Sequence, residues 1–485
     1  MRQRKVISIL FAMTLALAAC GNHEDASGQG TSETMKLQTE SIAAQESADT
    51  EEIEEQTEES DFQKTSTPEE DIQVESVNTS ANLEETVLVD ENDVRISVTG
   101  IEYKDHHIEL KLTLENNSDK DLSFISGSIG YSCNAVNGYM MPVGYLNTKV
   151  AAGKKANETI RFGYEELSLY GITEIADIQL GFDIQDEDYN HFYTGPRQLR
   201  TSAADSYDYE VDTYHQIIRS GAWEKLYKCT IDYFAEEELF DQNNIQIISE
   251  ALVTNKDGEK TFFIEVVNDS EEQIVVALSD IMLNGLGVCD STWSSGYVNP
   301  KTRCIIDLSP SSMLEEAYWE ALGISDIGDF SFSFLVYDSD YESINAQQTI
   351  NIVISEMAAM IDETGDELYN ENGIRIISKG LLEDSSTYSD DIHMLLLVEN
   401  SASETIYIDD VFDSLSVNDF MTDYYMRSRQ VPPGKYALVD IEIYASSLEN
   451  SGIMGIEDIS EAEISFKVRD EDYDTIAEPA VFVIY

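Results

Sequence analysis

The segment LVDENDV at Leu88–Val94 recurs twice more in this 485-residue chain. Its counterparts are LFDQNNI at Leu239–Ile245 and LYNENGI at Leu368–Ile374. In each copy, residues that tolerate positive φ (Asn-Asp, Asn-Asn or Asn-Gly) stand between two apolar stretches, which predicts a tight β-hairpin turn. Three copies of one turn predict a chain built from three related units.

The strongest strand pattern also occurs three times. Apolar and polar residues alternate through residues 178–184, 330–336 and 462–468. Strict alternation is typical of a strand with one buried face. Each strand follows a glycine and runs into an Asp-rich segment that ends in Tyr, and the spacing from glycine to Tyr is the same each time. The glycines are Gly171, Gly323 and Gly455, and the tyrosines are Tyr189, Tyr341 and Tyr473.

Further strands repeat as well. Apolar alternation at residues 108–114, 262–266 and 394–398 ends at an Asn-rich turn, and turn-like segments at 150–154, 298–301 and 431–435 lead into another strand. Many short strands with frequent turns predict an all-β fold of three tandem immunoglobulin-like β-sandwich domains, with a small Greek-key barrel as the alternative. We place the domains at residues 87–203, 238–355 and 367–485, with a linker at 356–366.

Helix signals are few. Ser312 and Glu315 have capping-box spacing before a helical segment at residues 317–322, and the counterparts near 167–170 and 448–449 are expected to be single turns. Residues 204–237 form an aromatic-rich connector. Its section from Tyr214 to Tyr233 is either a helix or a hairpin that covers the junction of the first two units.

The N-terminus predicts a signal peptide over residues 1–19. Arg2, Arg4 and Lys5 precede the short apolar run 6–17, which is too short to cross a bilayer comfortably. The following segment, Leu17-Ala18-Ala19-Cys20-Gly21, resembles a bacterial lipobox. That resemblance implies cleavage before Cys20 and a diacylglycerol on its sulfur, which would be the membrane contact of the protein. An ordinary secretory signal with a chance Cys is the alternative.

Residues 20–86 are mostly Ser, Thr, Gln, Glu and Asp. Such a segment buries too little apolar area to offset its chain entropy, so it is expected to be a disordered acidic tether. The formal net charge of the whole chain is -65. This charge repels phosphates, and nucleic-acid binding is therefore not expected. It favours solubility and self-repulsion, although it also attracts cations or basic partners.

The cysteines show neither metal-site nor redox-motif spacing. Besides Cys20 they are Cys133, Cys229, Cys289 and Cys304. Cys289 and Cys304 both fall in the second unit, so they either form a disulfide or are, like the others, buried or half-buried thiols.

No nucleophile elbow, phosphate loop, dinucleotide fingerprint or matched histidine set is present, so we expect no enzymatic activity, no catalytic residues and no cofactor. The Asp-rich ends at Asp186–Tyr189, Asp338–Tyr341 and Asp470–Tyr473 offer carboxylates for calcium. The alternative is a hairpin turn in which Asp caps its own backbone and Tyr closes the sandwich edge. We assign no metal site.

Loop aromatics are the candidate ligand-facing residues. Trp293 and Tyr297 lie in the second unit, and Tyr424 and Tyr425 occupy a similar place in the third. Tyr and Trp are favourable binding anchors, although such residues also serve as half-buried parts of a core.

The layout of lipobox, acidic tether and immunoglobulin-like repeats resembles uncharacterised surface lipoproteins of Gram-positive bacteria. That resemblance implies adhesion, cell-envelope or ligand-binding roles on the outer face of the cell membrane. Our leading hypothesis is a lipid-anchored, extracellular, non-enzymatic binding, adhesion or display protein. The alternative is an accessory subunit that docks a membrane enzyme, transporter or sensor, and a cell-envelope protein or glycan is the expected partner.

Overall fold

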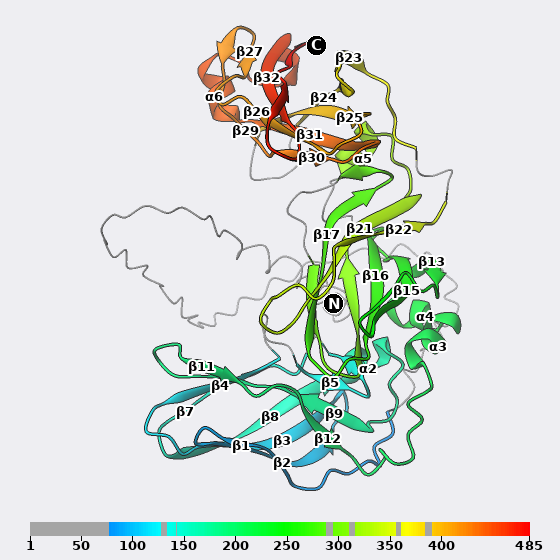
Figure 1. Cartoon of the computed structure of the whole chain (residues 1–485), viewed down its shortest axis with the longest axis vertical. Coiled ribbons are helices and arrows are strands. Elements are labelled where there is room, and N and C mark those ends of the chain that lie inside the picture. Colours follow the sequence, from blue (N-terminus) through cyan, green and yellow to red (C-terminus); the bar gives the residue numbers. More distant parts are fainter. Residues whose placement is uncertain are drawn as a thin grey trace, which may run out of the picture. The chain divides into compact units, whose positions relative to one another are not determined.

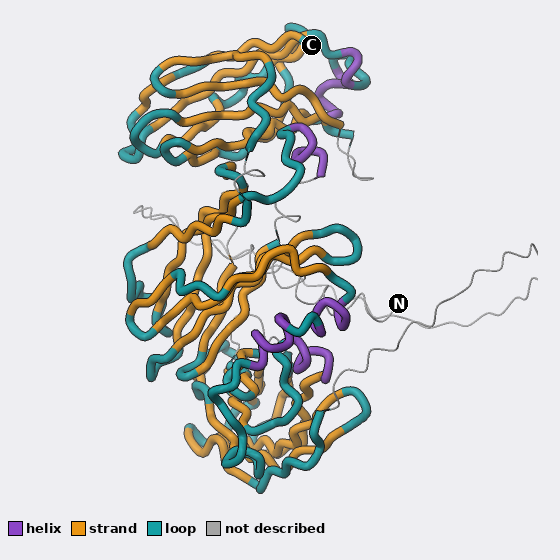
Figure 2. The backbone as a smooth tube through the Cα atoms, turned by 90° about the vertical axis from the view of Figure 1, so that its right-hand side faces the viewer, coloured by secondary structure: helices purple, strands orange, loops and turns teal. Residues whose placement is uncertain are grey.

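The computed structural model describes residues 77–127, 133–141, 143–287, 294–309, 316–355, 360–383 and 390–485. The signal peptide with Cys20, most of the tether, Cys289, Trp293 and the capping-box pair Ser312 and Glu315 lie outside these ranges. Strands dominate the described chain and its helices are short, as Figure 2 shows, which confirms the all-β prediction. Within the described ranges, no helix has the length and apolarity needed to span a membrane.

The three opening hairpins form as predicted. They are β1 (Thr86–Glu91) with β2 (Val94–Tyr103), β14 (Phe240–Gln242) with β15 (Ile245–Thr254), and β23 (Asp366–Glu371) with β24 (Ile374–Glu383). Both turn residues have positive φ in every copy, for example 50° at Asn92 and 59° at Asp93. Positive φ at both central positions defines the two-residue turn whose twist matches that of the strands.

Each hairpin begins a sheet, which we call the opening sheet. In order of the chain the sheets continue through β3 (His107–Asn116) and β8 (Lys154–Gly163), through β16 (Lys260–Asn268) and β20 (Thr302–Leu308), and through β25 (Ile392–Asn400) and β31 (Lys435–Ile443). We call the elements β1 to β12 repeat 1, β13 to β22 repeat 2 and β23 to β34 repeat 3 (Figure 1).

The alternating strand lies outside the opening sheet of its own repeat, in one further sheet in repeats 2 and 3 and in two in repeat 1. That strand is continuous in repeats 2 and 3, as β21 (Asp329–Tyr337) and β32 (Glu461–Arg469). In repeat 1 it breaks at Gly181 into β9 (Asp177–Leu180) and β10 (Asp183–Gln185). The break is held because the Ser126 hydroxyl donates to the Gly181 carbonyl and the Phe182 amide donates to Thr194 Oγ1.

The remaining strands complete these sheets. In repeat 1 they are β4 (Leu122–Ser126), β5 (Ala135–Val136), β6 (Tyr139–Met140), β7 (Leu146–Val150), β11 (His191–Tyr193) and β12 (Arg197–Arg200). In repeat 2 they are β17 (Ile274–Leu283), β18 (Leu286–Gly287), β19 (Ser294–Val298) and β22 (Gln348–Val353). In repeat 3 they are β26 (Ile406–Asp410), β27 (Ser416–Val417), β28 (Phe420–Met421), β29 (Tyr424–Met426), β30 (Arg429–Val431), β33 (Thr475–Ala477) and β34 (Ala480–Ile484).

One short helix precedes the alternating strand in every repeat: α2 (Tyr164–Leu169), α5 (Glu316–Ala321) and α6 (Ala445–Asn450). The prediction that only the second is a helix was wrong, since all three have 6 residues. Gly171 and Gly323 follow the first two helices with φ of 68° and 66°. In repeat 3 this place belongs to Gly452, with φ of 79°, whereas Gly455 is extended and precedes a short 3₁₀ turn, η2 (Ile456–Asp458). The gapless alignment through Gly455 therefore holds for the strand but not for the helix.

The connector folds into α3 (Thr213–Arg219), α4 (Ala222–Tyr227) and β13 (Thr230–Ala235). It is thus a helix pair followed by a strand, and β13 extends the opening sheet of repeat 2 by pairing with β15. The last part of the predicted tether is also ordered. Val77 and Ala81 are buried, and the Asn78 amide donates to the Thr173 carbonyl, so residues 77–85 pack on repeat 1.

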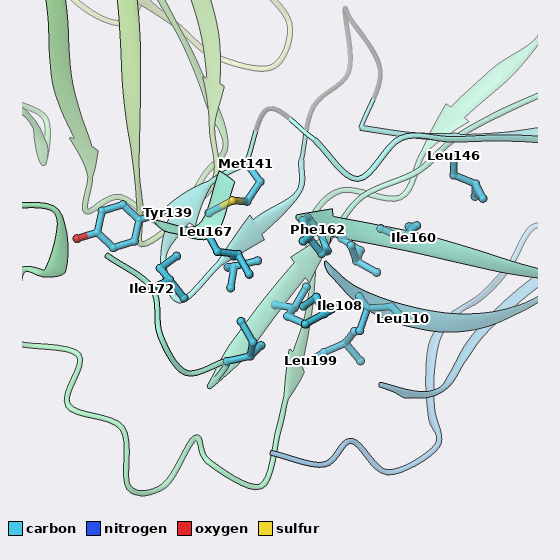
Figure 3. Close-up of a cluster of buried hydrophobic side chains, with 14 of the residues drawn as sticks. Ile108, Leu110, Tyr139, Met141, Leu146, Ile160, Phe162, Leu167, Ile172 and Leu199 are labelled. Carbon is cyan, nitrogen blue, oxygen red and sulfur yellow. The ribbon is translucent and has the colours of Figure 1, made fainter. Parts of the chain in front are cut away.

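Each repeat has a buried apolar cluster, and Figure 3 shows part of the cluster in repeat 1. Two clusters extend into the following repeat: Phe263 of repeat 2 joins the first, and Leu395 and Leu397 of repeat 3 join the second. Because neighbouring strand residues point to opposite faces, these side chains lie on the outer face of their own opening sheet. The opening sheets of repeats 2 and 3 therefore carry apolar residues on both faces, and their outer faces also include polar residues such as Glu265 and His393.

Candidate protein-binding surface

The two internal junctions between repeats share one backbone arrangement. A hairpin outside the opening sheet of one repeat lies parallel to the last strand of the next opening sheet, β6 beside β20 and β18 beside β31. In the first junction the Arg303 amide donates to the Gly138 carbonyl at 2.7 Å. In the second, the Tyr436 amide donates to the Gly285 carbonyl at 3.0 Å. Sheets of neighbouring repeats are therefore continuous across each junction.

The same hairpin occurs in repeat 3, between β27 and β28. An asparagine with positive φ begins the turn in all three copies: Asn137 at 50°, Asn284 at 51° and Asn418 at 49°. Its side chain fixes the turn against the start of the alternating strand. Asn418 Nδ2 donates to the Asp458 carbonyl, and its Oδ1 accepts the amides of Ser460 and Glu461. Equivalent bonds hold Asn137 and Asn284.

What differs in repeat 3 is that no strand of the described chain pairs with the outer edge of β28. The residue after the turn is Tyr139 in repeat 1 and Leu286 in repeat 2, with 4% and 0% of their surfaces exposed. Its counterpart Phe420 is 51% exposed, and the next residue, Met421, is 64% exposed. The position that is buried at both internal junctions is thus left uncovered at the third.

Other exposed apolar side chains lie on segments that are bonded to or follow this hairpin. Tyr425 lies on β29, a few residues beyond β28, and the Tyr444 amide donates to the Asp423 carbonyl between them. Met454 lies close to the hairpin, because its amide donates to Asp458 Oδ2 while the Asp458 carbonyl holds Asn418. We call Phe420, Met421, Tyr425, Tyr444 and Met454 the open end. All five are exposed.

The open end is bordered by carboxylates. Asp419, Asp423, Glu457 and Asp458 lie in or beside its segments and are exposed. An exposed apolar group with an acidic rim has the composition expected of a site for a protein partner, because apolar area supplies the free energy and rim charges select the partner.

The predicted ligand-facing aromatics do not form one site. Tyr425 belongs to the open end, whereas Tyr424 beside it is half-buried and donates its hydroxyl to Asp410 at 2.6 Å. Burial and this hydrogen bond raise the pKa of Tyr424 to about 12. Tyr297 lies on β19 of repeat 2, where its hydroxyl is 2.8 Å from that of Tyr341. Only Tyr425 of the described candidates is a free anchor.

The Asp-rich turns use their carboxylates internally. Asp186 Oδ1 accepts the amides of Asp188 and Asn190, and Asp338 and Asp470 make the same pair of bonds. A hydrogen bond from Lys120 is the main reason that the pKa of Asp186 lies well below its usual range. The geometry is that of the capped hairpin turn. The tyrosines that follow do not close the sandwich edge, since Tyr189, Tyr341 and Tyr473 are 83%, 57% and 65% exposed.

One group that sequence reasoning missed lies at the first junction. Ligand atoms of Asp212, His215 and Glu265 lie within 4.8 Å of one another, which is close enough to hold a metal ion. Arg303 Nη1 already lies 2.7 Å from Asp212 and 2.9 Å from Glu265, and His215 Nε2 lies 2.6 Å from Glu265. Burial lowers the pKa of His215, but the hydrogen bond and charge of Glu265, together with the charges of Asp212 and Glu236, leave it above its usual value.

The guanidinium of Arg303 is thus already paired with both carboxylates that a metal ion would need as ligands. We call Asp212, His215 and Glu265 the ionic lock between the connector and repeat 2. No local sequence motif predicts this cluster, because His215 and Glu265 are 50 residues apart.

Cysteine chemistry does not identify a second site. Cys133 is buried and accepts a hydrogen bond from Gln273, while Cys229 and Cys304 are half-buried. Burial raises the pKa of both Cys229 and Cys304 to about 12, so these thiols stay protonated and weakly nucleophilic at neutral pH. The proposed disulfide partner Cys289 lies outside the described residues.

No protein-family model matches the sequence, and no curated protein is detectably similar to it. Among solved structures, red sea bream transglutaminase is similar over 54% of this chain and 31% of its own, at 12% identity and a TM-score of 0.13. An exo-chitosanase of Amycolatopsis orientalis in complex with PNP-β-D-glucosamine is similar over 84% of this chain and 79% of its own, at 6% identity and a TM-score of 0.16. This chain spans about a third of the transglutaminase, and both TM-scores are too low to indicate a shared fold.

Proposed function

We propose that this protein is a non-enzymatic binding protein that docks another protein at the open end of repeat 3. The observation that carries the proposal is the contrast between Phe420, which is 51% exposed, and its buried counterparts Tyr139 and Leu286. At both internal junctions this place is an interface. The copy in repeat 3 has the same turn backbone, and it carries the large apolar side chains of Phe420 and Met421, which a turn that faces solvent does not need.

The distribution of apolar surface supports this choice of end. More than half of the exposed large apolar side chains of the described chain belong to repeat 3. Exposed apolar side chains that gather on neighbouring segments mark an interaction site more often than scattered single residues do. A protein partner fits the open end better than a glycan, because Phe420, Met421 and Met454 offer no hydrogen bonds to sugar hydroxyls.

The sequence supports attachment of the chain to the outer face of the cell membrane through lipid on Cys20. In this proposal the lipid holds the protein at the membrane, and repeat 3 captures the partner. The partner is a cell-envelope protein, which includes the case of an accessory subunit docked on a membrane enzyme, transporter or sensor.

The test is site-specific photocrosslinking in cells that naturally produce the protein. A photoreactive phenylalanine at position 420 is expected to give one discrete protein adduct, and Met421→Asp in the same chain is expected to abolish it. Position 482 is the matched control, because Phe482 is 48% exposed in the same repeat but lies on β34, which is separated from β28 by β27 and β32. Absence of an adduct from position 420, or the same adduct from both positions, contradicts the proposal.

A further inference from the structure

We infer that the open end binds a β-sheet domain of a different protein by edge pairing, with the partner strand lying parallel to β28. This inference rests on the proposed function and specifies the kind of partner. It follows from the two internal junctions, where the equivalent strands β6 and β18 both pair in parallel with the last strand of an opening sheet.

The backbone of the third hairpin is prepared for the same contact. The acceptor carbonyls at the internal junctions belong to Gly138 and Gly285, which have φ of 83° and 75°. Asp419 occupies the same place in repeat 3 with φ of 67°, and Asn418 holds its turn by the same side-chain bonds. The Asp419 carbonyl is therefore positioned to accept an amide from an added strand. Unpaired sheet edges are templates for such pairing.

The internal junctions also indicate what the partner offers beside its strand. The outer faces that cover the preceding repeat contain Phe263 in repeat 2, and Leu395 and Leu397 in repeat 3. We therefore expect an apolar outer face on the partner sheet, next to its free edge. The exposed carboxylates of Asp419 and Asp423 call for a lysine or arginine close to the pairing strand, as Arg303 is close to Tyr139.

A second copy of this chain fits less well, although its β8 offers the equivalent free edge. The outer face of that opening sheet carries Glu109, Lys111, Thr113 and Glu115 instead of apolar residues. Glu109 is bonded to Lys111 at 2.6 Å and to Arg161 at 2.9 Å. Covering these charges with Phe420 and Met421 would cost desolvation free energy, because the two apolar side chains offer no new ion pair in exchange. The net charge of -65 also opposes self-association.

The experiment places a known opening sheet, with its free strand edge and its apolar outer face, next to the open end. The full chain is extended after Tyr485 by a second copy of residues 354–485, so that an additional opening sheet follows repeat 3 with the natural linker. The added segment is uniformly 15N-labelled and joined by protein ligation, so that its peptides differ in mass from the identical peptides of the original repeat 3. Hydrogen exchange measured by mass spectrometry is then compared between this extended chain and the parent chain, for the unlabelled peptide that covers residues 418–426. Exchange is expected to slow by about tenfold or more in the extended chain.

Variants in the open end make the result specific. Phe420→Asp with Met421→Asp in the original repeat 3 is expected to return the exchange to the parent rate, and Phe482→Asp is expected to leave the protection in place. Retained protection of the added β25 copy shows that the added repeat is folded in each variant. Unchanged exchange at 418–426 despite a folded added repeat overturns edge pairing, while a Phe420-dependent protein adduct on cells would still support the proposed function.

Sedimentation velocity of the unextended chain tests the other occupant. A monomer over micromolar to near-millimolar concentration supports a different protein as the partner. Dimers or longer assemblies that Phe420→Asp abolishes, and Phe482→Asp does not, would assign the open end to a second copy and overturn the inference.

Discussion

The guanidinium of Arg303 lies 5.2 Å from the centre of the Tyr139 ring, and the backbones of the same two residues are paired across the first junction. Figure 3 shows Tyr139 at the margin of the apolar cluster, with its hydroxyl turned away from the other labelled side chains. Arg303 and Tyr139 therefore pair the two sheets through their backbones and make a cation–π contact through their side chains. Arg303 also binds two members of the ionic lock, Asp212 and Glu265.

Removing the cation of this pair is expected to weaken the first junction. Arg303→Met leaves the buried carboxylate of Glu265 with His215 and Ser249 as its remaining partners. The loss of one hydrogen bond between charged groups costs about 1.5–3 kcal/mol. Urea unfolding followed by tryptophan fluorescence reports this, since Trp223 packs against Phe263 near the junction, with ring centres 5.5 Å apart. Adding Glu265→Gln is expected to restore part of the loss, and strictly additive effects would contradict a direct pair.

The buried asparagine at the end of β25 is expected to be essential for repeat 3. Asn400 is fully buried, and Nδ2 donates to the carbonyls of Glu404 and Val431 while Oδ1 accepts the Ala402 amide. Asn400→Ala leaves these groups unpaired and should cost about 2–4 kcal/mol. Hydrogen exchange of residues 392–400 measures the local loss. The exposed Asn450→Ala should change exchange little, and equal effects of the two variants would contradict this role.

Stability should depend on pH through Glu250. Burial raises the pKa of this carboxyl to about 7 from 4.5, with the Tyr233 hydroxyl opposing and Glu237 adding to the shift. Because the folded-state pKa is raised, the neutral form contributes stability below about pH 4.5 that is lost as the pH rises through about 7. Glu250→Gln is therefore expected to raise the urea midpoint at pH 8 and to change it little at pH 4. The exposed Glu238→Gln is the control, and a pH-independent effect of Glu250→Gln would contradict the assignment.

The lipid anchor makes a prediction at the N-terminus. Cys20→Ser removes the sulfur that would carry the diacylglycerol, so the protein should move from the membrane fraction to the medium. Cys229→Ser, which changes a half-buried thiol instead, should leave the protein in the membrane fraction. Retention of the Cys20→Ser protein at the membrane would refute lipid attachment at this residue.

Local patterns predicted most of the fold. The turn residues Asn92, Asn243 and Asn372 require positive φ, which the sequence signals within a few residues, and alternation marks one buried strand face by period alone. Gly181 shows the limit of this reasoning. The alternating pattern passes through it unbroken, but the strand is interrupted there by a bond from the distant Ser126 hydroxyl to Gly181 and by a bond from the Phe182 amide to Thr194.

The candidate site was harder to predict, because it depends on pairings between repeats. The parallel contact of β6 with β20 joins residues such as Tyr139 and Arg303 that no local period relates. A signal did exist: Val136–Met140, Leu283–Gly287 and Val417–Met421 each place an asparagine and a turn residue between apolar positions, as the opening hairpins do. This pattern identifies the hairpin, but it does not show which of the three hairpins pairs with the opening sheet of a following repeat.

Because both junctions use the same backbone bond, only the side chains distinguish one junction from the other. Gly138 would accept the amide of Tyr436 as readily as that of Arg303, so deleting repeat 2 would leave a chain whose sheets still connect. The side chains at this new junction would not match. Tyr139 would face Tyr436 in place of Arg303, and Asp212 would lose the guanidinium of Arg303. The backbone bonds of a junction would therefore permit another number of repeats. The side chains at each junction determine which repeat fits next to which.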